Sequence, residues 1–145
     1  MSTATALTTV QIADMAVAAI RAEADLTPKP GLVDQRGSGA HSDMDLAMLH
    51  ASADALHSAF AECASAAHSF VTDPDLRTQL GAIGRAGEWK MLAATGGVNT
   101  HRGALWALGL LSAGAARTGT LDGAASMSAK RRVTSSSAQS TRAWS

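Results

Sequence analysis

The sequence has few of the residues that build disulfides, strands or large aromatic cores. It contains no tyrosine, two phenylalanines and three tryptophans in 145 residues, and Cys63 is its single cysteine. One cysteine forms no intrachain disulfide, so packing has to stabilise the fold. Alanine is abundant, and alanine-rich segments with few β-branched or aromatic residues favour closely packed helices. The composition therefore predicts an all-α fold, a compact multi-helix domain.

Long apolar runs and a secretion signal are also missing. The longest uncharged apolar segment has 14 residues, between Arg102 and Arg117, which is too short to cross a bilayer. The N-terminus has no basic stretch followed by the apolar core of a signal peptide. We therefore expect a cytoplasmic protein without a membrane partner.

The formal net charge is zero, but the charges are unevenly distributed. Residues 1–122 contain eight basic and twelve acidic residues, a net charge of −4, whereas residues 123–145 contain four basic residues and no acidic one. The basic residues gather only in this tail and no aromatics interleave with them, so we expect no nucleic-acid partner. We divide the chain into a helical domain over 1–122 and a Ser/Arg-rich tail over 123–145, whose composition predicts disorder.

Apolar residues recur every three or four positions in four segments, which predicts four helices. The predicted helices cover about residues 9–26, 43–70, 74–95 and 100–117. Thr8 and Gln11 have the spacing of a capping box at the start of the first helix. Ser42 is the expected N-cap of the second, with Asp43 and Asp45 in its first turn.

The ends of the last two predicted helices follow from local chemistry. Asp73 is the expected N-cap of the third helix, because the proline that follows it suits the first helical position. Gly96 and Gly97 end that helix, because glycine adopts the left-handed C-cap conformation. Asn99 or Thr100 then caps the fourth helix.

Two polar segments separate these helices. Residues 27–41 contain two prolines and three glycines, so they predict a long loop, and a long loop in a compact domain is usually functional or disordered. Residues 96–103 read Gly-Gly-Val-Asn-Thr-His-Arg-Gly. Each segment precedes a helix N-terminus, where free backbone N–H groups bind anions. We therefore predict a site for a phosphorylated substrate, with the Gly-rich helix junction as one part of it.

The common short motifs leave the function open. Residues 96–103 lack the Lys-Ser/Thr pair of a P-loop, and Gly37-Ser38-Gly39 lacks the third glycine of a dinucleotide fingerprint. No His-Glu-x-x-His zinc motif is present. The charged residues nevertheless suit a magnesium–nucleoside triphosphate. Positive charge for phosphates comes from Lys29, Arg36 and Arg102, and carboxylates for Mg²⁺ come from Asp34, Asp43 and Glu88.

Other polar and aromatic residues have simpler interpretations. His50, Asp54 and His57 share one face of a predicted helix, and we interpret them as a solvated face rather than a metal site. We interpret Trp89 and Trp106 as core residues.

Four stretches together resemble the signature segments of the triphosphoribosyl-dephospho-CoA synthase family. They are Thr27–Asp34, Gly39–Met44, Gly84–Glu88 and Met91–Gly103. The resemblance extends over about residues 10–122 and is strongest to the branch that serves malonate decarboxylase, with the citrate lyase branch as the near alternative. It implies an all-helical enzyme that transfers the 5-triphosphoribosyl group of ATP to the 2′-hydroxyl of 3′-dephospho-CoA and releases adenine. The product is the precursor of the prosthetic group of an acyl-carrier protein.

The resemblance also implies roles for individual residues. The implied catalytic residues are Glu88, His101, Asp34 and His41. The implied substrate- and phosphate-binding residues are Lys29, Arg36, Gly96, Gly97, Asn99, Thr100 and Arg102. The implied ligands of Mg²⁺, which accompanies the ATP, are Asp34, Asp43 and Glu88.

Members of this family are longer, and the family-like sequence stops near Gly123. The tail reads as out-of-frame translation or a truncation, so we expect this chain alone to be weakly stable or inactive. Two further hypotheses stay open beside the transferase. One is a Mg²⁺-dependent nucleotide phosphohydrolase, and the other is a non-catalytic helical interaction module.

Overall fold

The structure is a computed structural model that describes residues 6–70 and 72–124. The described residues form five α-helices and no β-strand, which confirms the all-α prediction. The helices are α1 (Thr9–Asp25), α2 (Leu46–Ala55), α3 (His57–Ser69), α4 (Asp73–Ala94) and α5 (Arg102–Thr118). Nearly all of the predicted tail, residues 125–145, lies outside the described residues.

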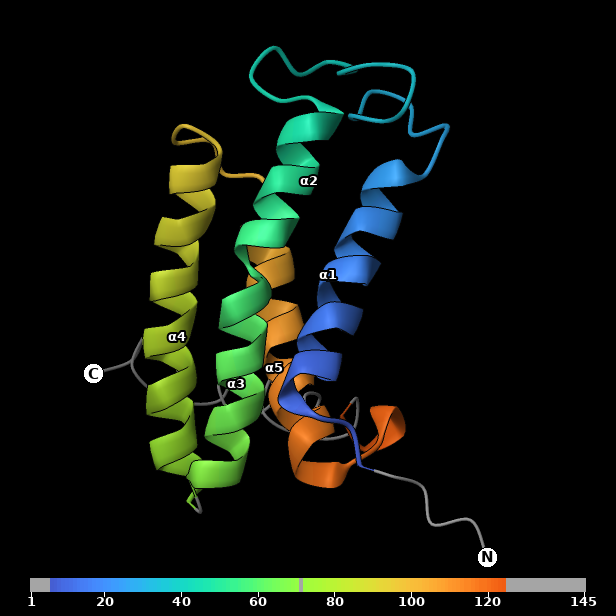
Figure 1. Ribbon diagram of the computed structural model, residues 1–145. Helices are drawn as coiled ribbons and strands as arrows, with labels where there is room; N and C mark the ends of the chain where they lie inside the picture. Colours follow the sequence, from blue (N-terminus) through green and yellow to red (C-terminus); the bar gives the residue numbers. More distant parts are fainter. Residues whose placement is uncertain (1–5, 71, 125–145) are drawn as a thin grey trace, which may run out of the picture.

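The helices form an up-and-down bundle (Figure 1). Helices α2 and α3 follow one another along nearly one axis, and α1 and α4 run in the opposite direction beside them. Helix α5 packs against α1, α3 and α4, and its contact with α3 is the most extensive in the bundle. The chain therefore reverses direction at the α1–α2, α3–α4 and α4–α5 connections, and this places both polar segments at the same end of the molecule.

Helix α1 begins as the sequence predicts. The Thr8 hydroxyl accepts a hydrogen bond from the Gln11 backbone N–H at 3.1 Å, and the Gln11 side chain accepts one from the Thr8 N–H at 2.9 Å. This reciprocal pair is a capping box, and it satisfies two backbone donors that the first turn leaves free.

The predicted second helix is wrong at its start and at its centre. Asp45 is the N-cap in place of Ser42, because its backbone is extended and its carboxylate accepts from the Met48 N–H at 2.8 Å. The expected single helix is also interrupted at Leu56. There the N–H of Leu56 donates to the Ala53 carbonyl at 3.1 Å. This bond spans three residues, as in a 3₁₀-helix, and not the four of an α-helix.

The predicted cap of α4 is one residue too late. Thr72 is the N-cap, with its hydroxyl accepting from the Asp75 N–H at 3.3 Å. Asp73 already belongs to the helix, and its carboxylate in the first turn interacts favourably with the helix dipole.

Small residues let the helices approach closely in the core. The Sγ of Cys63 on α3 lies 3.4 Å from the place a β-carbon at Gly109 of α5 would occupy. The largest fully buried side chains are Phe60, Leu56, Leu76, Met91 and Leu105. The prediction for the tryptophans is wrong, because Trp89 is 74% exposed and Trp106 is 36% exposed. Aliphatic side chains, Met91 and Phe60 therefore fill the space between the helices, and the tryptophans do not.

Burial makes Cys63 a poor nucleophile. Its thiol is buried, and burial, with a smaller contribution from the charge of Glu62, raises its pKa to about 12. We expect DTNB to label the native chain about a hundredfold more slowly at about pH 8 than the denatured chain, because the thiolate is the reactive form. Stopped-flow absorbance measures both rates, and equal rates would contradict this packing.

The polar face of α2 and α3 does not simply face solvent, because its side chains form two hydrogen bonds and one ion pair with α1. The pairs are His50–Asp25 at 2.7 Å, His57–Asp14 at 2.7 Å and Asp54–Arg21 at 2.9 Å. Our interpretation of these side chains as a solvated face is therefore incomplete, because the same side chains also contact α1. They align α1 with α2 and α3 along the bundle.

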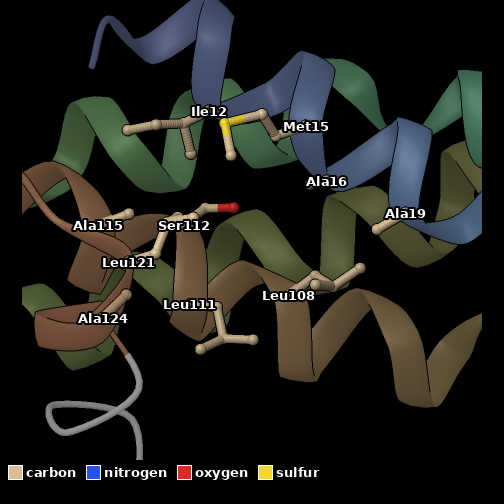
Figure 2. Close-up of a pocket in the computed structure, with 10 residues that line it drawn as sticks. All are labelled: Ile12, Met15, Ala16, Ala19, Leu108, Leu111, Ser112, Ala115, Leu121 and Ala124. Carbon is tan, nitrogen blue, oxygen red and sulfur yellow. The ribbon is translucent and has the colours of Figure 1, made fainter.

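An apolar groove lies between α1 and α5, on the half of the bundle away from the polar segments. Figure 2 shows Ile12 and Met15 of α1 facing Ser112 and Ala115 of α5 across it. Its volume is about 290 Å³.

Across 6–70 and 72–124, none of the helices combines the length and apolar character needed to cross a bilayer.

Candidate active site

The two polar segments meet at one end of the bundle (Figure 1). The first joins α1 to α2 over residues 26–45, and the second joins α4 to α5 over residues 95–101. Helices α2 and α5 both begin at this end. Their first turns present backbone N–H groups, of which those of Met48 and Arg102 donate to side chains, and the positive ends of two helix dipoles. The predicted convergence of these segments on an anion-binding end is consistent with this geometry.

Asp34 organises the first segment. Its carboxylate is buried and accepts hydrogen bonds from the backbone N–H groups of Lys29 and Arg36, both at 2.8 Å. The Arg36 guanidinium adds a contact of 2.9 Å from Nη2 and one of 3.0 Å from Nε. The hydrogen bond from Arg36, followed by that from Lys29, holds the pKa of Asp34 well below its usual range. Asp34 is therefore an ionised anchor of the loop.

The other predicted residues of this segment have different surroundings. The Lys29 ammonium donates to the carbonyls of Ala24 at 3.0 Å and Glu23 at 3.2 Å, at the C-terminal end of α1. The Arg36 side chain is 58% exposed beside a hollow of about 280 Å³ within the loop. His41 and Asp43 lie at the surface, with Nδ1 of the imidazole 3.9 Å from Oδ1 of the carboxylate.

One glycine of this loop has a steric role. Gly39 has φ +58°, and a β-carbon at this position would lie 2.5 Å from the Leu32 carbonyl oxygen. Both the left-handed backbone and the close approach exclude larger residues. The hollow beside Arg36 therefore depends on backbone that only glycine can form.

The second segment ends α4 as the sequence predicts. Gly96 and Gly97 have φ of +65° and +96°, and the Gly97 N–H donates to the Leu92 carbonyl at 2.8 Å. This bond is part of the Schellman arrangement that satisfies the last carbonyls of a helix. Thr95 is buried beneath it, and its hydroxyl accepts from the Val98 N–H at 3.1 Å. These hydrogen bonds close the turn, and its two glycines present backbone without side chains at the candidate site.

The N-cap of α5 differs from the prediction of Asn99 or Thr100. His101 occupies the N-cap position, and its side chain makes no capping hydrogen bond. The Asn99 amide oxygen still accepts from the Arg102 N–H at 3.3 Å. The His101 ring is therefore available for other contacts.

His101 contacts α2 through a residue that the sequence analysis missed. Its Nδ1 lies 2.9 Å from the hydroxyl of Ser52, which is fully buried and lies 2.5 Å from the Thr100 hydroxyl. Burial is the main cause that lowers the pKa of His101 below 6.5. Ser52 shares its helix face with buried Leu49 and Ala53. A polar residue on an apolar helix face is the sequence signal that could have identified Ser52 as a candidate site residue.

Glu88 and Arg102 pair across the α4–α5 junction. The Glu88 carboxylate accepts from Arg102 Nε at 2.9 Å and from the Trp106 indole N–H at 2.7 Å. Gly84 makes room for this arrangement, because a β-carbon there would lie 2.5 Å from the Trp106 ring. The stretch Gly84–Glu88 thus supplies one carboxylate and the space for the ring that orients it.

Gly84→Ala should displace the Trp106 ring and break its hydrogen bond to Glu88. We expect a loss of about 1–3 kcal/mol in the free energy of unfolding, typical of an overpacked core. The Trp106 indole N–H resonance, assigned with a Trp106→Phe variant, should shift strongly. Gly81→Ala is the matched control, because its methyl group meets only the tip of the Arg85 side chain at 3.3 Å. Equal effects of the two substitutions would contradict the contact with Trp106.

The predicted metal ligands do not gather into one cluster. In the part of the chain that the structure describes, no three His, Cys, Asp or Glu side chains are placed to hold a metal ion. The Asp34 carboxylate already accepts hydrogen bonds from Lys29 and Arg36 of its own loop. The side chain of Asp43 is 58% exposed, and Glu88 accepts its hydrogen bonds through one carboxylate oxygen only. Mg²⁺ usually takes one or two protein carboxylates and completes its shell with phosphate oxygens and water. In the described residues the three predicted ligands therefore do not form one magnesium site, although Asp43 and Glu88 each keep a carboxylate oxygen available.

The comparisons with known proteins agree on one family. A family model described as ATP:dephospho-CoA triphosphoribosyl transferase matches residues 9–144. A protein of Stutzerimonas stutzeri, named as a probable 2-(5''-triphosphoribosyl)-3'-dephosphocoenzyme-A synthase, is 61% identical over 106 residues, which are 72% of this chain and 37% of that protein. An Azotobacter vinelandii protein of the same name is 60% identical over 107 residues, 73% of this chain and 37% of that protein. No solved structure matches.

The chain spans about 37% of the length of these curated relatives. The family match covers most of the chain, including every polar residue described above at the candidate site. The resemblance to the family is thereby confirmed, and the closer similarity to the malonate decarboxylase branch stays a prediction. This chain belongs to the ATP:dephospho-CoA triphosphoribosyl transferase family.

Proposed function

We propose that the polar end of the bundle binds ATP and 3′-dephospho-CoA and transfers the 5-triphosphoribosyl group of ATP to the 2′-hydroxyl of dephospho-CoA, with release of adenine. Membership of the family supports this activity. The observation that carries the proposal is the convergence of the family-like stretches. The hydrogen bonds of Ser52 to Thr100 and His101 join the second half of α2 to the α4–α5 segment, which lies at the same end of the bundle as the first segment.

Exposed positive charge supports a triphosphate at this end. The side chains of Arg36 and Arg102 are 58% and 63% exposed, and each is held on one side by a carboxylate. The first turn of α5 adds backbone N–H groups, which bind phosphate at helix N-termini. Gly96 and Gly97 leave the neighbouring backbone open to phosphate oxygens. Lys29 contributes its charge from the end of α1.

The reaction needs a proton acceptor, a proton donor and stabilisation of positive charge. The 2′-oxygen of dephospho-CoA forms a bond to C1′ of the ATP ribose as the bond from C1′ to adenine breaks, and the triphosphate stays on the ribose. The hydroxyl loses a proton and adenine gains one. We assign acceptance of the proton to His101 and stabilisation of the ribose cation to Glu88, as carboxylates do in glycoside cleavage. Asn99 and Thr100 lie beside His101 and would bind the ribose.

Mg²⁺ enters this proposal with ATP. Asp43 and Glu88 are the carboxylates with oxygens left for it, and Asp34 holds the loop in place. The ion would neutralise triphosphate charge. His41 lies beside Asp43 at the surface and would orient the substrate.

The product would supply the prosthetic group of an acyl-carrier protein. We assign this carrier to malonate decarboxylase, with citrate lyase as the alternative, because the signature stretches are most similar to that branch. We place the reaction in the cytoplasm, where ATP and coenzyme A precursors are available.

Product analysis tests the proposed reaction. ATP, Mg²⁺ and dephospho-CoA are incubated with the chain, and with a full-length relative whose matching segment is replaced by residues 9–122 of this chain. Free adenine, formed in step with a triphosphoribosylated dephospho-CoA, supports the transferase. Inorganic phosphate without adenine would instead favour the phosphohydrolase. The expectation that the chain alone is weakly stable or inactive stays a prediction, and the grafted protein separates it from the chemistry of the site.

A further inference from the structure

The imidazole of His101 has one satisfied nitrogen and one bare nitrogen. The residue is 8% exposed, and its Nδ1 lies 2.9 Å from Ser52 Oγ. Within 6–70 and 72–124, no protein group hydrogen-bonds its Nε2. A polar atom of a side chain that is more than nine-tenths buried normally has a partner. Nε2 is therefore the atom that a bound ligand would satisfy.

The hydroxyls of Ser52 and Thr100 allow two arrangements of protons. In the first, Thr100 donates to Ser52 and Ser52 donates to Nδ1, so the ring proton sits on Nε2. In the second, Nδ1–H donates to Ser52 and Ser52 donates to Thr100, so Nε2 carries a lone pair. The Ser52–Thr100 distance of 2.5 Å fits either direction.

Burial separates these two arrangements. Both arrangements leave Nε2 without a partner in the described residues, but an orphaned N–H donor, as in the first, is rarer in protein interiors than an under-satisfied acceptor, as in the second. In the second arrangement, Nδ1–H has Ser52 as its acceptor and the Ser52 hydroxyl has Thr100 as its acceptor. The Thr100 hydroxyl can then donate to water, because Thr100 is only half-buried. The second arrangement therefore has the lower energy in the chain without a ligand.

We propose that Ser52 and Thr100 are positioning residues that hold His101 as the Nδ1–H tautomer, so that Nε2 is a bare acceptor for a substrate hydroxyl. The charged groups that act on the ring are Glu23 of α1 and Lys29 of the first segment. Burial outweighs the opposing effect of Glu23 and lowers the pKa of the ring, which keeps it neutral near pH 7. A neutral ring is the form that accepts a proton.

This inference rests on the proposed function only for its catalytic consequence. There, Nε2 takes the proton of the attacking 2′-hydroxyl as the oxygen bonds to the ribose, and the ring becomes an imidazolium. Ser52 then accepts a stronger hydrogen bond from Nδ1–H, since the ring is charged. Ser52 never touches the reacting atoms, and its effect reaches them through the orientation and tautomer of His101.

The tautomer is tested by NMR on the ¹⁵N-labelled full chain at about pH 8, where the ring is neutral. Long-range ¹H–¹⁵N spectra distinguish protonated from bare ring nitrogens, and a His101→Gln variant assigns the signals. We expect a protonated Nδ1 and a bare Nε2. A protonated Nε2, or an average of the two forms, would overturn the proposal.

Variants of the hydroxyl pair test its cause. Ser52→Ala should shift the ring toward a mixture of tautomers, whereas Thr100→Ser, which keeps the hydroxyl, should not. Ser112→Ala removes another buried serine and is the matched control for folding, because it lies in the α1–α5 groove. An unchanged His101 spectrum in folded Ser52→Ala would refute the role of Ser52.

Adenine release provides a separate readout of the catalytic consequence. This readout uses the protein that releases adenine, whether the chain itself or the grafted full-length relative. There, Ser52→Ala should lower kcat about tenfold or more with little change in KM, since a positioning residue acts on the chemical step. An equal rise of KM with unchanged kcat would overturn the positioning role. If no adenine forms with the unaltered protein, the proposed function fails while the NMR result still decides the tautomer.

Discussion

Replacing His101 with glutamine should lower the rate of adenine release about a hundredfold to ten-thousandfold, the usual contribution of a general base. Glutamine keeps a polar side chain near Ser52 but has no group that accepts a proton at neutral pH. Its amide can still bond to the Ser52 hydroxyl, so we expect the α2–α5 contact to persist. The measurement is the initial rate of adenine formation with ATP, Mg²⁺ and dephospho-CoA at saturation, in the grafted full-length protein and in the chain.

His57→Gln is the matched control for this substitution. His57 lies on α3 and pairs with Asp14 of α1 at 2.7 Å, away from the polar segments. We expect its adenine release to stay near that of the unaltered protein. Turnover that survives His101→Gln would remove His101 from the chemical step and leave the other candidates, such as Glu88 and His41, for the role of base.

Asp34→Asn should disorder the first polar segment and weaken the binding of ATP. The neutral amide offers one acceptor oxygen where the carboxylate accepts from Lys29 and Arg36, and it loses the ion pair with Arg36. Amide hydrogen exchange in residues 27–41 should accelerate about tenfold or more, because the loop opens more often. The thermal midpoint should fall by several degrees. Amide exchange in α3 should accelerate only by the amount expected from this loss of global stability.

The pH dependence separates the charge of Asp34 from its shape. Its pKa is lowered in the folded state, so its stabilising effect is complete above the ordinary aspartate pKa of about 3.9 and is lost as the pH falls further. The difference in thermal midpoint between the native chain and Asp34→Asn should therefore be largest near neutral pH and shrink below about pH 4. A constant difference across this range would contradict an ionised anchor.

Local patterns predicted much of the fold. The capping box of Thr8, the glycines that end α4 and the two polar segments all depend on neighbouring residues, and the structure confirms them. The errors arise where local rules compete. Ser42 and Asp45 are both good N-caps, and only the folded loop selects Asp45.

The sequence pointed to candidate site residues, whose roles stay predictions, but not to the contacts between them. Sequence spacing places Glu88 and Arg102 on different helices, and only the antiparallel packing of α4 and α5 brings them to 2.9 Å. Ser52 went unnoticed because its partners lie nearly fifty residues away along the chain. Exposed Trp89 shows a similar limit, since hydrophobicity alone does not tell which face of a helix is covered.

The most direct test of the account is an NMR titration of the ¹⁵N-labelled chain with Mg²⁺–ATP. The account predicts saturable shifts at the polar end of the bundle, in Arg36, Gly96, Gly97, Asn99 and the His101 ring. Resonances of the α1–α5 groove, such as Met15 and Ala115, should stay in place (Figure 2). Shifts confined to the groove, or no saturable shift at the polar end, would contradict an ATP site formed by the two polar segments.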